Sequence, residues 1–358
     1  MKLTLQIKLL PTEEESQILF ETIKQANHVC DRISEFAFAQ KIFNQFKLHQ
    51  ALYHDLKTEE ILSAQMLVRC FGKVSQSYKV SKKTLHKFRP LGAIAYDSRI
   101  LSYKGTVASI WAIGGRLSIP FVCHNPKYLP YIKGEADLVT KKGKFYLFQT
   151  VEIPDKDIED VEEFIGVDFG INNIATLSDG TIYSSDSLNA VREKYQRTRS
   201  SVQSKGTRGS RKLLKRLGGR EHRFATITNH TISKRIVKKA VSEKKGIAIE
   251  DLTYIRDTTV VRKGQKRKHH SWSFAQLRSF LSYKSLMAGI PLAVVDPRNT
   301  SRTCSECDHI DKKSRKSQSE FVCVQCGFSL NADINAARNI AKLGSFVNRP
   351  ENRRFKVC

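Results

Sequence analysis

Residues 163–185, EFIGVDFGINNIATLSDGTIYSS, decide the fold of the second half of the chain. An apolar run that ends at Asp168 predicts a buried strand, and a second apolar run follows after a short connection. Asp179 and Gly180 then predict a tight turn into a third strand. The segment therefore predicts a three-stranded meander whose first strand ends in an acidic residue.

Two further strands follow this meander. The apolar segment GIAIE ends at Glu250, and PLAVVD covers residues 291–296. Between the meander and Glu250, residues 192–245 carry 18 Lys or Arg and three Glu, a net charge of +15. This basic stretch predicts long helices, which we expect to be broken at Gly206, Gly209, Gly218 and Gly219.

The first half of the chain predicts a sheet with a helical insert. The segment KLTLQIKLL alternates apolar and polar residues, as a half-buried strand does. Thr12 and Glu15 then form a capping-box pattern before a long amphipathic helix, and a second helix is expected over about 58–80. From about 92 to 155, hairpins around residues 114–115 and 142–143 predict a small β-barrel completed by the first strand.

The charge of the chain indicates a polyanionic partner. Its 358 residues carry a net charge of +26 and have a pI near 9.8, which makes nucleic acid the leading candidate. An anionic membrane would require a basic amphipathic helix or a lipidation signal, and neither is found. We also find no secretory signal and no apolar run of about 18 residues. Four of the eight cysteines are scattered singly, which suits a reducing cytosol.

The other four cysteines form two paired knuckles. The spacing C-x2-C-x15-C-x2-C can present four thiolates tetrahedrally to one structural Zn²⁺. A redox dithiol would need a single such motif in a thioredoxin-like context, which is absent here. The predicted zinc ligands are Cys304, Cys307, Cys323 and Cys326.

Three acidic residues are candidates for a catalytic site. Taken singly, Asp168 and Glu250 are typical strand-end residues, and Asp333 is a typical charge at a helix start. Their order along the chain, however, follows the ribonuclease H pattern of a meander, a helix, a further strand and a later helix. Three clustered carboxylates would repel by about 4 kcal/mol per pair, and divalent cations remove that penalty. The pattern therefore predicts a two-metal phosphodiesterase site.

Four segments carry a family resemblance: GVDFGINNIATLSDG, GIAIEDL, VDPRNTSRTCSECDH and NADINAARNI. They resemble the signature segments of TnpB (OrfB) proteins of bacterial and archaeal insertion sequences, which are related to type V CRISPR effector nucleases. The resemblance implies a RuvC-like triad at Asp168, Glu250 and Asp333 that binds two Mg²⁺ or Mn²⁺. One departure is Asp308, which stands where family members usually have Gly and affects only a turn of the ribbon.

The resemblance implies an α/β multidomain protein. We expect a β-barrel wedge domain over 1–11 and 86–160, with a helical recognition insert over 12–85. We expect a RuvC-like, ribonuclease H-type nuclease domain over 161–303 and 331–358. A zinc ribbon over 304–330 is inserted into it.

The function implied is that of an RNA-guided DNA endonuclease of a transposable element. Its partners would be a guide RNA from the end of the element and double-stranded target DNA that carries a short flanking motif. Two alternatives stay open: a DNA strand-transferring transposase with the same acidic fold, and a guide-dependent DNA-binding repressor. The expected location is the cytoplasm of a bacterial or archaeal cell, near the nucleoid. The oligomeric state stays open.

Side chains of basic or amide type are the candidate nucleic-acid contacts, although any single one is as typical of a solvated helix face. They come from the second helix, from the basic run at 79–89 and from the basic helices at 192–245, and a further basic run covers 262–270. The candidates are Gln65, Arg69, Lys73, Gln76, Lys82, Lys83, Arg211, Lys212, Lys215, Arg216 and Arg220.

Overall fold

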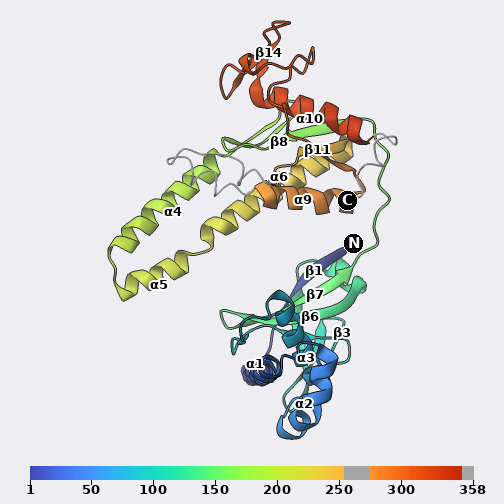
Figure 1. Cartoon of the computed structure of the whole chain (residues 1–358), viewed down its shortest axis with the longest axis vertical. Coiled ribbons are helices and arrows are strands. Elements are labelled where there is room, and N and C mark those ends of the chain that lie inside the picture. The colour runs from blue at the N-terminus through green and yellow to red at the C-terminus, as the bar shows by residue number, and fades with distance from the viewer. Residues whose placement is uncertain (254–273, 349–358) are drawn as a thin grey trace. The chain divides into compact units, whose positions relative to one another are not determined.

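The computed structural model describes residues 1–253 and 274–348 of the chain (Figure 1). The basic run at 262–270 therefore lies outside the described residues. The chain divides into two compact units, Met1–Pro154 and Asp155–Cys358. Each unit is described by itself below.

The first unit contains a seven-stranded antiparallel sheet in the order β2-β6-β7-β1-β5-β4-β3. Only residues 97–100 separate the two edge strands along the chain, so the sheet is nearly closed. This agrees with the expectation of a small barrel. The strands are β1 Lys2–Leu9, β2 Ile94–Tyr96, β3 Leu101–Lys104, β4 Val107–Ala112, β5 Gly115–Cys123, β6 Ile132–Lys141 and β7 Lys144–Glu152, with a short 3-10 helix η1 at Pro126–Tyr131.

Three helices separate β1 from β2: α1 Glu13–Gln40, α2 Gln45–Glu59 and α3 Ala64–Val80. The capping box of Thr12 and Glu15 is present, as predicted. The single second helix expected over 58–80 is wrong, because the chain forms α2 first and α3 begins only after the N-cap Ser63. In α2 only Leu48 and Leu56 are buried, so its apolar pattern is too sparse to stand out in the sequence.

The second unit is built on a five-stranded sheet in the order β10-β9-β8-β11-β12. Strands β8, β9 and β10 form the predicted antiparallel meander, and β11 and β12 continue from β8 as parallel strands. The bounds are β8 Phe164–Asp168, β9 Asn173–Leu177, β10 Ile182–Ser184, β11 Gly246–Glu250 and β12 Leu292–Val295.

The long basic stretch forms three helices that extend to one side of this sheet (Figure 1): α4 Asp186–Ser204, α5 Arg208–Leu217 and α6 Arg220–Glu243. The predicted breaks at Gly206, Gly218 and Gly219 are present, and Gly206 and Gly219 have positive φ angles of 60° and 81°. The predicted break at Gly209 is wrong. This glycine lies in the first turn of α5, where Thr207 caps the helix and tolerates it.

Helices cover both faces of the five-stranded sheet. Alternate residues Ile165, Val167, Ile247 and Ile249 pack in one core with α6 and with α9, Phe274–Ala288. Phe164 and Ala248 point to the other face, where they pack against Ile340 of α10, Ala332–Asn348. By the same alternation, Asp168 and Glu250 point toward the face that α10 covers.

Two glycines let α10 lie directly on the sheet. A Cβ added at Gly166 would stand 1.9 Å from the carbonyl oxygen of Ala337, and one at Gly344 would stand 2.4 Å from the Cβ of Ala248. The backbones of helix and sheet are therefore in contact, which leaves no room for any side chain at these positions. This close packing places the first turn of α10, and Asp333 with it, beside the strands.

A small subdomain, residues 304–331, precedes α10 and contains the four paired cysteines. Its regular elements are the 3-10 turn η2 Lys312–Ser314 and the two-stranded sheet of β13 Glu320–Val322 and β14 Ser329–Asn331. In the described parts of the chain, no helix combines the length and apolarity that crossing a bilayer requires.

Candidate acidic site and cysteine cluster

The two strand-end acids, Asp168 and Glu250, lie side by side at the carboxyl ends of two inner strands of the five-stranded sheet. Val167 of β8 stands opposite Ile249 of β11 in a parallel register, so Asp168 and Glu250 are the next residues of both strands. Because these two strands are parallel and in register, they end side by side, and both acidic side chains point to the same face of the sheet. Glu250 is 8% exposed and Asp168 is partly buried.

Asp333 comes from a segment 83 positions beyond Glu250 in the sequence and lies in the first turn of α10. Its Oδ2 accepts a hydrogen bond of 3.0 Å from the Asn173 side chain on β9, and its backbone N–H is capped by Asn331. Its Oδ1 stands 3.5 Å from the guanidinium of Arg315, which comes from the small subdomain. The structure thus brings together all three acids that the sequence singled out.

The electrostatics show that this negative charge is poorly compensated. Burial, followed by the charges of Glu250 and Asp333, raises the pKa of Asp168 to about 8, and Arg315 offsets only part of this. Burial also raises the pKa of Glu250, although a hydrogen bond from Thr300 acts in the opposite direction. A carboxyl group that burial and like charges keep protonated would be ionised by a nearby cation.

The donor set suits hard divalent cations. Three carboxylates supply the oxygen ligands that Mg²⁺ and Mn²⁺ prefer.

Thr300 ties Glu250 to the helix that carries Asp333. Its hydroxyl donates a hydrogen bond of 2.5 Å to Glu250, and its backbone carbonyl accepts one of 2.8 Å from Asn339 of α10. Asn335 and Asn339 also donate to the carbonyl of Thr303. The asparagines of the NADINAARNI segment therefore hold the turn that leads from β12 into the small subdomain.

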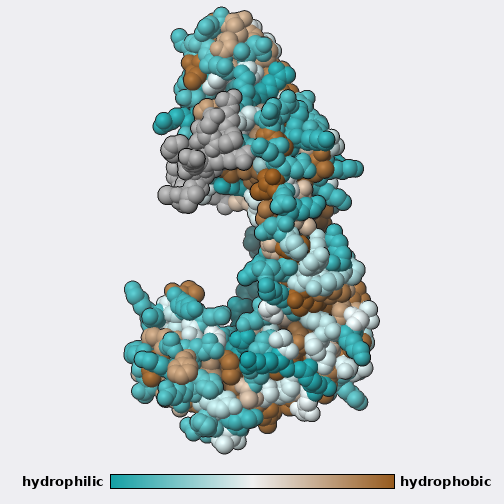
Figure 2. Space-filling view, turned by 90° about the vertical axis from the view of Figure 1, so that its right-hand side faces the viewer, coloured by the Kyte–Doolittle hydropathy of each residue, from teal (hydrophilic) through white to brown (hydrophobic). Residues whose placement is uncertain are grey.

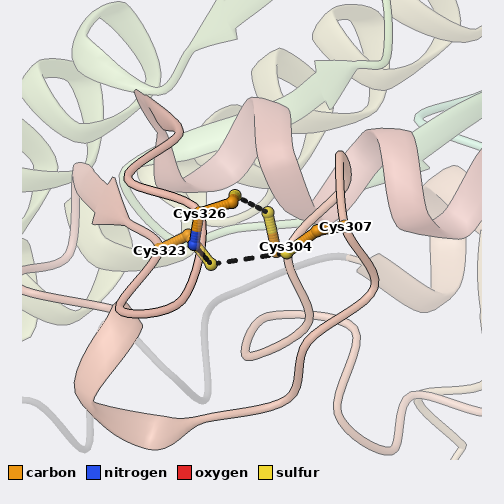
Figure 3. A group of neighbouring side chains, drawn as sticks. All are labelled: Cys304, Cys307, Cys323 and Cys326. Atoms are coloured by element: carbon orange, nitrogen blue, oxygen red, sulfur yellow. Dashed lines mark hydrogen bonds between the residues drawn. The ribbon is translucent and has the colours of Figure 1, made fainter.

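The four cysteines form one cluster within the small subdomain (Figure 3). The sulfur atoms of Cys304 and Cys326 are 3.8 Å apart, and those of Cys307 and Cys323 are 3.6 Å apart. A regular tetrahedron with metal–sulfur bonds of ~2.3 Å has sulfur atoms about 3.8 Å apart. The cluster therefore fits a metal ion with four thiolate ligands.

The candidate nucleic-acid contacts of α3 already have partners inside the first unit. Gln65 donates to Asp97, Arg69 forms an ion pair with Glu135, and Lys73 donates to the carbonyl of Ala93 at 2.8 Å. Arg69, Lys73 and Gln76 nevertheless line one polar groove of about 410 Å³ between α3 and the sheet. The structure therefore gathers these three residues, while Gln65 lies outside the lining of that groove.

The remaining candidates are exposed. Lys82 and Lys83 follow α3 in a loop, and Lys82 lies 5.7 Å from the centre of the Phe43 ring. On the second unit, the candidates of α5 and the first residue of α6 are also exposed: Arg211, Lys212, Lys215, Arg216 and Arg220. Figure 2 shows that hydrophilic residues cover much of the visible face. These positions are accessible to a polyanion.

The structure adds three residues that the sequence did not single out: Thr300, Asn173 and Arg315. Thr300 belongs to the segment VDPRNTSRTCSECDH and Asn173 to GVDFGINNIATLSDG, and both segments carry the family resemblance, so a signal for these two residues existed. Arg315 is one of several cations in the run KKSRKS, and nothing in the sequence separates it from its neighbours. Only the packing of the small subdomain brings it to the acids.

Comparison with known proteins places two segments in families. Residues 148–258 match OrfB_IS605, described as a probable transposase, and residues 274–340 match the family described as Cas12f1-like, TNB domain. Both families agree with the segments that carry the resemblance.

Three curated relatives are similar to parts of the chain. The CRISPR-associated endodeoxyribonuclease Cas12f1 of Sulfoacidibacillus thermotolerans is 41% identical over 36% of this chain and 30% of its own length. The putative RNA-guided DNA endonuclease InsQ of Escherichia coli is 30% identical over 57% of this chain and 55% of its own. The TnpB-like protein MJ0751 of Methanocaldococcus jannaschii is 29% identical over 44% of this chain and 59% of its own length. The chain thus matches 30–59% of the length of these relatives, and its resemblance to TnpB (OrfB) proteins and type V effectors is confirmed.

Proposed function

We propose that this chain is the RNA-guided DNA endonuclease of an insertion sequence, which cuts double-stranded DNA matching its guide. The observation that carries the proposal is the meeting of Asp168, Glu250 and Asp333 on one face of the five-stranded sheet. The three residues come from distant parts of the chain, and buried carboxylates that lie close together repel one another. A site that gathers them would therefore need bound cations to function.

The order of the second sheet supports a RuvC-like domain of the ribonuclease H type. A meander followed by two parallel strands, with the acids on its first and fourth strands and on the last helix, is the arrangement that the sequence order implied. The domain would comprise residues 161–303 and 331–358. Its cysteine subdomain, residues 304–330, would be a ribbon around one structural Zn²⁺.

The acids would hold two Mg²⁺, or Mn²⁺, in this domain. Such ions, when bound, generate a nucleophilic hydroxide and stabilise the leaving oxygen of a phosphodiester. Glu250 and Asp168 would be held in place by their strands, with Thr300 orienting the Glu250 carboxylate. Asn173 would orient Asp333 through their hydrogen bond of 3.0 Å. Arg315 can offer its guanidinium to a phosphate oxygen at the same site.

Guide RNA and target DNA would occupy the basic surfaces. The relatives include a putative RNA-guided DNA endonuclease, and residues 192–245 alone carry a net charge of +15. The sheet of the first unit would form a wedge domain over 1–11 and 86–160, with α1 to α3 as a recognition insert over 12–85. The groove of Arg69, Lys73 and Gln76 is where the insert would contact the motif beside the target.

The test is to purify the full chain from cells with and without the flanking DNA of its element, and to sequence any RNA that co-purifies. We expect Mg²⁺-dependent cutting of DNA that matches this RNA, and none of DNA that does not. Neutralising about eight phosphates predicts a log–log salt slope for binding near −6 to −7.

Two results would contradict the proposal. Cutting at the full rate after ribonuclease treatment of RNA-free protein would favour the transposase alternative. Guide-dependent DNA binding without cutting, in Mg²⁺ and in Mn²⁺, would favour the repressor. A matched control is the Asp168→Asn variant, which changes no backbone and should bind without cutting.

A further inference from the structure

A groove between α4 and α6 is lined by aromatic and basic residues that have no part in the proposed catalytic site. It has a volume of about 410 Å³, within the range typical of ligand sites, and its lining includes the aromatic residues Tyr195 and Phe224. Phe224 also packs against the core of the second unit, which fixes its position. Ile227 adds a further apolar side chain to the lining and is 64% exposed.

Cations line the same groove. Lys194 of α4 and Arg220 and Arg223 of α6 all contribute to its walls and are exposed. On α6, Arg220 stands three residues before Arg223 and four before Phe224, and on α4 Val191 of the same lining stands three residues before Lys194 and four before Tyr195, so each set shares a helix face. The groove therefore combines flat apolar surfaces with three positive charges.

These charges have no acidic partner among the described residues. The two acids nearest along the helices pair elsewhere: Glu193 lies 3.9 Å from Arg197, and Glu221 lies 3.3 Å from Arg199. No ion pair of the described chain includes Lys194, Arg220 or Arg223. The groove thus keeps a local positive field that only an anionic ligand would neutralise.

We propose that this groove binds an unpaired nucleotide of a single-stranded nucleic acid, with the base against Tyr195 and its phosphates against Arg220 and Arg223. Aromatic side chains beside cations are the usual means of holding unpaired bases, because every base has a flat face and every nucleotide a charge. A base inside a duplex is already stacked and cannot enter. A second copy of this chain is the less suitable occupant, since it would bring two strongly positive surfaces together.

The inference rests on the proposed function only in its choice of nucleic acid as the partner, and it is tested by binding alone. The full chain is washed free of RNA at high salt and kept in EDTA, so that neither guide loading nor cutting affects the result. The probes are a ten-nucleotide RNA and the DNA of the same sequence, each with one 2-aminopurine, and the duplex of that DNA. Fluorescence of 2-aminopurine falls when the base stacks on a ring.

Tyr195→Ala should weaken single-strand binding roughly 5- to 150-fold and abolish the fluorescence change, with little effect on duplex binding. Tyr195→Phe and Tyr195→Trp should retain both signals, because they keep the ring. Tyr131→Ala is the matched control, since Tyr131 belongs to the first unit, is 40% exposed and is not among the residues that line the groove. Arg220→Ala with Arg223→Ala should reduce the salt slope by about 1.4, two phosphates at ~0.7 each.

Comparing the RNA probe with the DNA probe shows which kind of single strand the groove binds, and binding of either kind supports the proposal. If Tyr195→Ala binds both the RNA and the DNA strand with the affinity and the fluorescence quenching of the parent protein, the proposal is overturned. A fall in the mass of the nucleic-acid-free protein from dimer to monomer in Tyr195→Ala, measured by light scattering, would overturn it in favour of a second copy. These outcomes are independent of whether the protein cuts DNA.

Discussion

The guanidinium of Arg315 lies 3.5 Å from the Asp333 carboxylate, so a cation of the cysteine subdomain enters the acidic site. Its charge also lowers the raised pKa values of Asp168 and Glu250. In the metal-free protein, Arg315 thus does part of what divalent ions would do. The subdomain and the acidic site are electrostatically coupled.

This coupling predicts that Arg315→Ala binds Mg²⁺ more tightly in the absence of DNA, by roughly tenfold, because one competing positive charge is removed. Calorimetric titration of the DNA-free protein measures this. Arg315→Lys keeps the charge and should behave like the parent protein. Equal Mg²⁺ affinities for the Ala and Lys variants would separate Arg315 from the site.

The acids themselves are expected to be indispensable for cutting. Alanine at Asp168, Glu250 or Asp333 should abolish cleavage and leave binding of RNA and target DNA largely intact, because these side chains would hold metal rather than nucleic acid. Cleavage and electrophoretic binding assays on the same preparations test both parts. An Asp333→Ala variant that cuts at the parental rate would remove this residue from the mechanism.

The raised pKa of Asp168 predicts a pH-dependent stability of the metal-free protein. With a folded-state pKa of about 8, above the usual value near 4, the folded state binds the extra proton between these values. This contribution to stability is complete below about pH 4 and is lost as the pH rises through about 8. Asp168→Asn should therefore gain stability over the parent as the pH rises.

Urea unfolding in EDTA at several pH values measures this difference. The Asn variant and the parent should agree most closely near pH 4, and saturating Mg²⁺ should restore the parent at pH 8. A stability difference that does not change with pH would mean that Asp168 is not buried among negative charges in solution.

Thr300 offers a test of the hydrogen bond to Glu250. Thr300→Val keeps the shape of the side chain and removes the donor, which leaves a buried carboxylate short of one partner and should cost about 1–3 kcal/mol of unfolding free energy. Thr300→Ser keeps the hydroxyl and should recover most of the loss. If Ser is as destabilised as Val, the methyl group rather than the hydrogen bond is responsible.

The cysteine cluster predicts one zinc per chain. Cys304→Ser should release the metal and unfold at least residues 304–330, since binding and folding free energies are coupled in such sites. Mass spectrometry of metals and limited proteolysis provide the readouts. Cys123→Ser is the matched control, because this cysteine lies in the first unit and outside the cluster. Folded parent protein without zinc would contradict the prediction.

Local patterns in the sequence determined much of this protein. Alternation, apolar runs and turn residues predicted β1, the hairpins β4–β5 and β6–β7 and the strands of the second sheet, although not β2 and β3. The capping box of Thr12 predicted the start of α1, and cysteine spacing predicted the four-thiol cluster. These features depend on neighbours within a few residues, which is why they can be read without a structure. The sequence did not predict the helix α2, because this helix buries only two side chains and its apolar pattern is sparse.

Contacts between distant segments were decided by the tertiary structure alone. The meeting of Asp168 with Glu250 depends on the parallel register of β8 and β11, and the position of Asp333 depends on α10 lying against Gly166. Arg315 has the same local context as the other cations around it, yet it alone of them reaches the acids. A sequence specifies the residue types that a site can use, whereas the distances between them, and the pKa values that follow, arise only when packing brings the segments together.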